Sequence, residues 1–107
     1  PFETEPGALR VPFYHSNIDN DEVLFYHDGD FFSRKGIDKG MVTLHPAGVH
    51  HGPQPGAAEG AAKKEMTDEV AVMIECQQPL QVSPEAEKTS VEAYATSWAR
   101  GLGLLDE

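Results

Sequence analysis

The sequence predicts an all-β fold, an antiparallel sandwich or barrel that is followed by a short C-terminal helix. Short apolar and aromatic runs separated by turn residues recur up to Val82, as is typical of antiparallel strands. The remaining residues carry helix-start signals instead. The length of 107 residues fits one domain, residues 1–107, with surface enough to bury one core. Alternation within the strands is too weak to distinguish a sandwich from a barrel.

The expected strands are short. In chain order they are Leu9–Tyr14, Glu22–Tyr26, Phe31–Arg34, Met41–His45 and Glu69–Cys76, with Pro79–Val82 continuing the last one after a kink. Asp28-Gly29 lies between the second and third strands and is a strong hairpin signal, so these two strands are expected to pair through a short turn. The last strand has the clearest alternation, at Val70, Val72 and Ile74.

A loop and a terminal helix complete the expected order. Residues 52–64 are rich in small and turn-forming residues and predict a loop with at most one helical turn. Ser83, which precedes a proline, and Ser90 are N-cap signals. A short helix is therefore expected over Val91–Trp98, ended by Gly101, with its tryptophan packing the helix onto the sheet.

The charge balance narrows the choice of partners. Eighteen acidic and eight basic residues give a net charge of −10, whereas nucleic acids and anionic membranes bind clustered Lys and Arg. We therefore expect neither partner. Cys76 is the only cysteine, so no disulfide can form within the chain, which fits a cytoplasmic location. No apolar run approaches the roughly 20 residues of a membrane span, and no signal peptide opens the chain.

The five histidines all lie between His15 and His51. His15 and Glu22 lie at the edges of a loop between two expected strands, and a later strand ends in a Pro-x-Gly turn that is followed by a histidine. Two histidines and one carboxylate near strand ends can form the facial triad that holds non-haem Fe(II). Such a site would carry a charge of +1 and attract an anionic or catecholate-like ligand. Asp21 is the rival carboxylate, because strand alternation points only one of the two inward.

Two stretches resemble the paired motifs of the cupin superfamily. The first is His15-x-Asn17-x4-Glu22-x6-Gly29, and the second is Gly40-x5-Pro46-x-Gly48-x2-His51. Asn17 stands where the superfamily usually has a second histidine, and Pro55 replaces the asparagine that ends the second motif. The resemblance implies a cupin-type double-stranded β-helix, a jelly-roll barrel, and the glutamate of the first motif favours Glu22 over Asp21.

Nearly the whole chain resembles the homogentisate 1,2-dioxygenase family, chiefly its bacterial forms. The resemblance is carried by PFYHSN, by DEVLFYHDGDFFS, by HPAG with the following HHGP, and by the ending Tyr94…Ser97-Trp98. The family also has Asn at the position of Asn17. The resemblance implies that His15, Glu22 and His51 are iron ligands. It further implies that His45 lies beside the metal as a catalytic residue and that His45 and His51 contact the substrate.

The same resemblance implies an Fe(II)-dependent ring-cleaving dioxygenase that converts homogentisate and O2 to maleylacetoacetate in tyrosine and phenylalanine catabolism. It also implies a homo-oligomer, a trimer or hexamer, and makes this chain the C-terminal part of a longer enzyme whose other part carries the acid-base histidine. Ser16 stands where the family often has Arg, and Phe31 where some members have a substrate-binding Tyr. A related hydroquinone or gentisate-type acid is therefore an alternative substrate.

Other functions stay open at this stage. The same ligands could hold Zn, Mn or Ni in a cupin that binds a metal or small molecule without catalysis. The chain could also be a purely structural part of a barrel. Outside the proposed site, His27 and His50 are expected to be exposed, whereas Tyr14, Phe25 and Phe31 are expected in the core.

Overall fold

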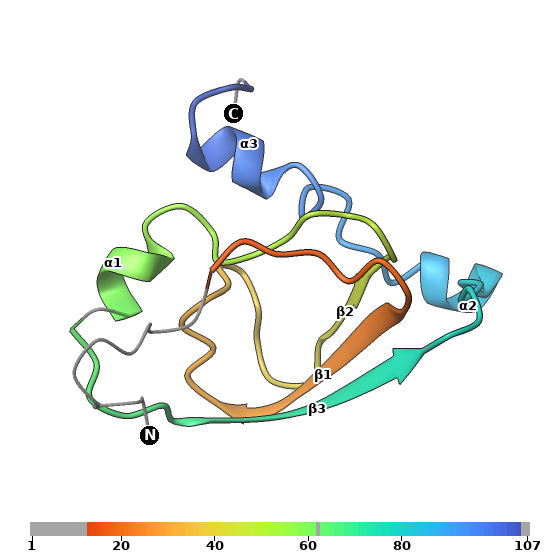
Figure 1. Ribbon diagram of the computed structural model, residues 1–107, viewed down its shortest axis with the longest axis horizontal. Coiled ribbons are helices and arrows are strands. Elements are labelled where there is room, and N and C mark those ends of the chain that lie inside the picture. Colours follow the sequence, from red (N-terminus) through yellow and green to blue (C-terminus); the bar gives the residue numbers. More distant parts are fainter. Residues whose placement is uncertain (1–12, 62, 106–107) are drawn as a thin grey trace.

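The computed structural model of the chain describes residues 13–61 and 63–105. Its centre is a three-stranded antiparallel sheet with the order β2-β1-β3, formed by β1 (Asp21–Gly29), β2 (Val42–His45) and β3 (Glu69–Cys76). Figure 1 shows this sheet open, with the short helices α1 (Ala57–Ala61), α2 (Pro84–Glu87) and α3 (Ser97–Gly101) around it. An antiparallel sheet with few short helices is compatible with the expected all-β fold. The described strands do not close into a barrel.

The strand register divides the sheet into two faces. Glu22 lies opposite His45 and Glu75, and Val23 lies opposite Leu44 and Ile74. Directly opposite residues share a face, so the register defines an inner and an outer face. The inner face carries Glu22, Leu24, Tyr26, Thr43, His45, Ala71, Met73 and Glu75, and the outer face carries Asp21, Val23, Phe25, Val42, Leu44, Val72, Ile74 and Cys76. The outer face is thus apolar except for Asp21 at the start of β1, whereas the inner face mixes apolar and polar side chains.

A small core lies under the inner face. Tyr26 packs its ring against Phe31 edge to face, at 4.9 Å between ring centroids, and both side chains are buried. The Tyr26 hydroxyl shares a hydrogen bond of 3.0 Å with the Thr43 hydroxyl across the β1–β2 pair. Phe31 is therefore a core residue, as predicted. The same prediction was wrong for Tyr14 and Phe25, whose side chains are 58% and 38% exposed.

The predicted hairpin at Asp28-Gly29 was wrong. β1 continues to Gly29 through a bulge, and residues 31–34 form turns instead of the returning strand. The Gly29 backbone has a φ of 106°, and a Cβ on it would lie 2.1 Å from the Asp68 carbonyl oxygen. Glycine is therefore required at this position because the start of β3 approaches the β1 backbone closely.

Two other strand predictions also differ from the structure. Of the strand expected over 9–14, residues 9–12 lie outside the described part of the chain, and residues 13–14 are not in a strand. His15 instead forms an isolated bridge with His51. Residues 79–82 do not continue β3. The Leu80 N–H donates to the Asp21 carboxylate instead of to the backbone of a neighbouring strand.

The helices follow local signals only in part. α1 is the single turn expected within the 52–64 loop. α2 begins at the expected cap, where the Ser83 hydroxyl accepts a hydrogen bond of 3.2 Å from the Ala86 N–H. The helix expected over Val91–Trp98 was wrong, since residues 92–96 form turns and α3 begins only at Ser97. Ser90 caps no helix. Among the described residues, none of the helices has the length and apolar character needed to cross a membrane.

Candidate metal centre

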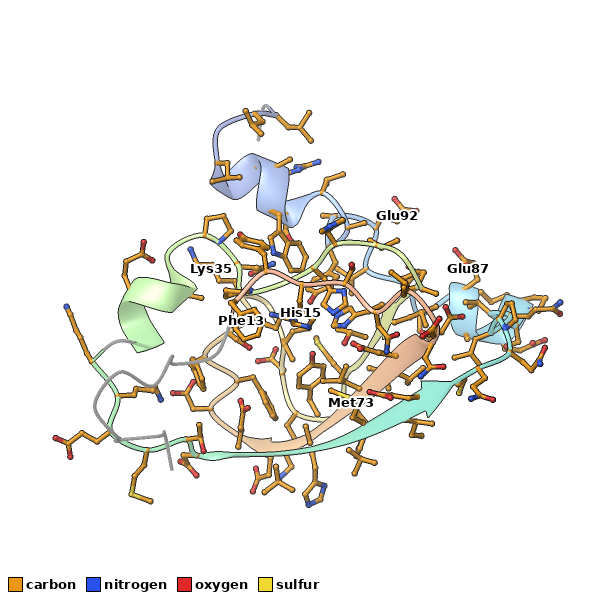
Figure 2. All side chains as sticks on the ribbon, viewed as in Figure 1. Phe13, His15, Lys35, Met73, Glu87 and Glu92 are labelled. Atoms are coloured by element: carbon orange, nitrogen blue, oxygen red, sulfur yellow. The ribbon has the colours of Figure 1, made fainter. Side chains whose placement is uncertain are left out.

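Three side chains with metal-ligating atoms converge beside the inner face. They are His15 from the segment before β1, Glu22 from β1 and His51 from the loop after β2, and their ligand-type atoms all lie within 4.8 Å of one another. His15 and His51 also pair through their backbones, with N···O distances of 2.9 and 2.8 Å. Glu22 and His51 are buried, whereas His15 is exposed. Figure 2 shows His15 in the middle of the molecule, beside Phe13.

Backbone carbonyls fix the orientation of both histidines. The Nδ1 atom of His15 lies 2.7 Å from the Phe13 carbonyl oxygen, and Nδ1 of His51 lies 3.0 Å from the Val49 carbonyl oxygen. A carbonyl can only accept, so Nδ1 donates in both rings and Nε2 keeps its lone pair. The Nε2 atom of His51 is buried without a hydrogen bond and lies 3.3 Å from Glu22 Oε2. A lone pair that faces a carboxylate this closely needs a proton or a cation between them.

Asn17 and Asp21, two neighbours of Glu22, make different hydrogen bonds. The Asn17 side-chain N–H donates to Glu22 Oε1 at 3.4 Å, so the residue in place of the superfamily's second histidine holds the carboxylate. Asp21 faces away from the group. Its two oxygens accept the N–H groups of Ala47 and Leu80 at 2.7 and 2.8 Å. These bonds, Leu80 first, hold the pKa of Asp21 below its usual value. The geometry therefore favours Glu22 over its rival.

His45 lies directly beside this group. Its ring stacks on His51 with 4.2 Å between centroids, and its Nδ1 is 3.6 Å from Glu22 Oε2, beyond hydrogen-bond distance. Both ring nitrogens are buried without a hydrogen bond. Burial, followed by the charges of His51 and Arg34, lowers the pKa of His45 to about 4, although Glu22 opposes the shift. His45 is therefore neutral at physiological pH and offers one hydrogen-bond donor and one acceptor.

A pocket of about 420 Å³ adjoins His45 and His51. Its walls are mostly apolar and aromatic, and they consist of Leu44, His45, Pro46, Val49, His50, His51, Tyr94, Ala95 and Trp98. Burial raises the pKa of Tyr94 to about 12, so its hydroxyl stays protonated. The volume lies within the range of small-molecule sites. His50, expected as an exposed turn residue, is exposed and also lines this pocket.

The sequence had not pointed to every residue around the site. Tyr94 was not expected at a pocket, although its spacing of four from Trp98 on a turn-rich tail was a usable signal. Arg34 was not expected here either, since it was assigned to a strand. Phe31 packs in the core and Ser16 does not line the pocket, so neither contributes to its wall.

Comparisons with known proteins found similar sequences. The family model described as homogentisate 1,2-dioxygenase C-terminal matches residues 3–103. A protein of Saccharolobus solfataricus that is named "Putative dioxygenase" is 44% identical over 99 residues, which cover 91% of this chain and 26% of that protein. The chain thus spans about a quarter of the length of this relative. No solved structure matches the chain.

Proposed function

Because the chain belongs to the homogentisate 1,2-dioxygenase C-terminal family, we propose that it is the metal-bearing part of a non-haem Fe(II) dioxygenase that cleaves the ring of an aromatic diol. Homogentisate is the first substrate to test, with maleylacetoacetate as the product in tyrosine and phenylalanine catabolism. The observation that carries the proposal is the buried Nε2 of His51, which lies 3.3 Å from the Glu22 carboxylate and has no hydrogen bond.

The residues present fit a divalent metal ion. Two imidazoles with free Nε2 atoms and one carboxylate are the donor set of non-haem Fe(II) sites. The ion would be held by His15, Glu22 and His51, and when bound it would bring the diol and O2 together and lower the pKa of a substrate hydroxyl. His15 is the exposed member of the group, so the opening to solvent lies on its side.

The chain's own residues account for binding of an aromatic substrate and for hydrogen bonds to its oxygen atoms. The pocket beside His45 and His51 is lined in part by the aromatic side chains of Tyr94 and Trp98, which can pack against a substrate ring. His45 is neutral and has no hydrogen-bond partner at either ring nitrogen, so it can donate a hydrogen bond to a substrate oxygen or accept one from a substrate hydroxyl. The protonated Tyr94 hydroxyl is available as a donor to a substrate oxygen. Ser16 and Phe31 leave a gentisate-type acid as the alternative substrate.

Further parts of the proposal concern the whole protein. The open sheet would be completed into a cupin double-stranded β-helix by strands outside β1, β2 and β3. The chain would be the C-terminal part of a longer polypeptide, in line with its coverage of 26% of the relative. By the same family relation, the protein would be a cytoplasmic trimer or hexamer.

The test uses the full-length protein. Iron content and O2 uptake are measured with homogentisate and with gentisate, for the wild type, for His51→Ala and for Glu22→Gln. We expect both variants to lose iron and to lose O2 uptake. His27→Ala is the control, because His27 is exposed and lies outside the group.

Wild-type protein that binds no iron, or His51→Ala that consumes O2 like the wild type, would overturn the proposal. A tightly held metal without O2 uptake with either diol would favour a cupin that binds a metal without catalysis.

A further inference from the structure

We propose that Arg34 and Trp98 act as positioning residues that hold His51 and His15 in place by clamping the carbonyl group of Gly52. Neither belongs to the metal-ligating group. Arg34 lies in the loop between β1 and β2, and Trp98 lies in α3. The placement of the two histidines is argued from hydrogen bonds and backbone contacts alone. The expected effect on metal affinity rests on the proposed function.

The Gly52 carbonyl oxygen accepts two side-chain hydrogen bonds. The Arg34 guanidinium donates from Nη1 at 2.7 Å, and the Trp98 indole donates from Nε1 at 3.2 Å. The two donors also contact each other, since the guanidinium lies 5.8 Å from the centroid of the indole ring. Gly52 is buried, so losing either donor would leave its oxygen short of a partner that water does not readily replace. The two bonds fix the position of this peptide group.

Gly52 transmits its position to both histidines. It directly follows His51, and its backbone lies against Tyr14, which directly precedes His15. A Cβ at Gly52 would lie 2.9 Å from the Tyr14 Cα, a spacing that real side chains do not show. His51 and His15 are then joined by the two backbone hydrogen bonds of their bridge. A displaced Gly52 would therefore move both histidines relative to Glu22.

The same two chain segments also hold the residues after Gly52. The Gln54 N–H donates to the Ser33 carbonyl at 3.1 Å, and its side-chain N–H donates to the Ser97 hydroxyl at 2.6 Å. The Gln54 side-chain oxygen accepts from the Lys35 N–H. α3 contains no fully buried residue, and the Pro55 side chain lies against its Gly101. Its polar bonds to Gly52 and Gln54 tie it to the loop that carries His51.

The test uses full-length protein with Trp98→Phe and Arg34→Lys. Phe keeps an aromatic ring but removes the N–H donor, and Lys keeps the charge but not the fork-shaped geometry. Arg100→Gln, in the same helix, and Lys35→Gln, beside Arg34, are the matched controls. Neither of these side chains bonds to Gly52.

Two readouts are measured. The first is hydrogen exchange of metal-free protein, followed by mass spectrometry of peptides that contain the His15 and His51 amides. We expect exchange about fivefold faster in each variant, the factor that corresponds to one ordinary hydrogen bond. The second is the dissociation constant of Co²⁺, which we expect to rise about tenfold, as for other groups that orient metal ligands.

The outcomes separate this inference from the proposed function. Exchange at His15 and His51 that matches the wild type, or that accelerates equally in the β1 and β3 peptides, would overturn the positioning role. Co²⁺ affinity that is unchanged in both variants would also overturn it. If wild-type protein binds no Co²⁺ while exchange accelerates only at the two histidines, the positioning role stands and the metal proposal fails.

Discussion

Replacing Gly52 with Ala should separate the two histidine segments. The φ angle of Gly52 lies outside the left-handed region, so alanine meets no backbone strain there. The added methyl group would instead lie 2.7 Å from Tyr14 Cδ1 and 2.9 Å from Tyr14 Cα. The ring atom can move away by rotation of the side chain. The Cα cannot, so the backbone of Tyr14 or of Gly52 must shift.

The size of the shift follows from these distances. Two carbon atoms in contact are separated by roughly 3.5 Å, so the two segments must move apart by about half an ångström. The bridge bonds between His15 and His51, now 2.9 and 2.8 Å, would lengthen beyond the optimum for N–H···O bonds. Overpacking of this kind typically destabilises a protein by about 1–3 kcal/mol. A misplaced ligand should further weaken metal binding about tenfold, which corresponds to about 1.4 kcal/mol.

The assay is urea unfolding of metal-free, full-length protein, combined with Co²⁺ titration. Gly60→Ala is the matched control, because a Cβ at Gly60 in α1 meets no atom within 4 Å. We expect the control to be neutral or slightly stabilising. If Gly52→Ala were as stable as the control and bound Co²⁺ with wild-type affinity, the close approach of Gly52 to Tyr14 would not govern the histidine bridge.

Three further predictions concern the sheet. Tyr26→Phe removes the buried hydroxyl bond to Thr43 and should lower the free energy of unfolding by about 1 kcal/mol, less in a Thr43→Val background, as a double-mutant cycle would measure. The pKa of Asp21 is lowered on folding, so its contribution to stability is present above the ordinary value of 3.8 and is lost as the pH falls through the lower folded pKa. Asp21→Asn should therefore destabilise the protein at pH 7 and weaken the pH dependence of stability below about pH 4. Val72 and Ile74 are about half exposed on the outer face. If another part of the full-length protein covers this face, residues 1–107 alone should bind a hydrophobic dye more strongly per chain than the full-length protein does. Equal binding would contradict such coverage.

Strand positions could be predicted from the sequence where one local signal was enough. β2 and β3 lie where their apolar runs indicate, and Ser83 caps α2 through its own hydroxyl. The hairpin prediction was wrong because the need for glycine at Gly29 has a long-range cause. Its missing Cβ makes room for the Asp68 carbonyl, which is far away in the sequence. An Asp-Gly pair has the same sequence whether it forms a hairpin turn or allows another part of the backbone to approach closely.

The prediction of a helix over Val91–Trp98 was wrong for a related reason. Residues 91–98 carry a helix-like pattern, yet residues 92–96 form successive turns, such as the one closed by the bond from the Tyr94 N–H to the Val91 carbonyl. Helices this short are marginal without tertiary support. Here the support acts on Ser97 and Trp98, through Gln54 and Gly52, so the helix begins where those bonds are made.

The convergence of the metal-ligating group could be predicted because its members are side chains with a motif spacing. His15, Glu22 and His51 do meet, within 4.8 Å. The clamp on Gly52 could not be predicted, because its acceptor is a backbone carbonyl and every residue has one. Only the fold decides which carbonyl lies between Arg34 and Trp98. A sequence pattern therefore cannot reveal residues that orient a site through the backbone, even where it reveals the side chains of the metal-ligating group.

The two faces of the sheet explain why alternation was too weak to choose an architecture. A sheet with one solvated face alternates apolar and polar residues, whereas a sheet covered on both sides does not. Here the outer face is apolar except for Asp21 at the start of β1, and the inner face carries Glu22, Thr43 and His45 among apolar neighbours. Polar residues normally mark the solvent-facing side of a sheet. In this sheet they mark the face that carries the candidate metal centre. Exposed apolar side chains such as Val72 and Ile74 are therefore not evidence of a solvent-facing side in this sheet, and the dye-binding comparison tests whether their face is covered in the full-length protein.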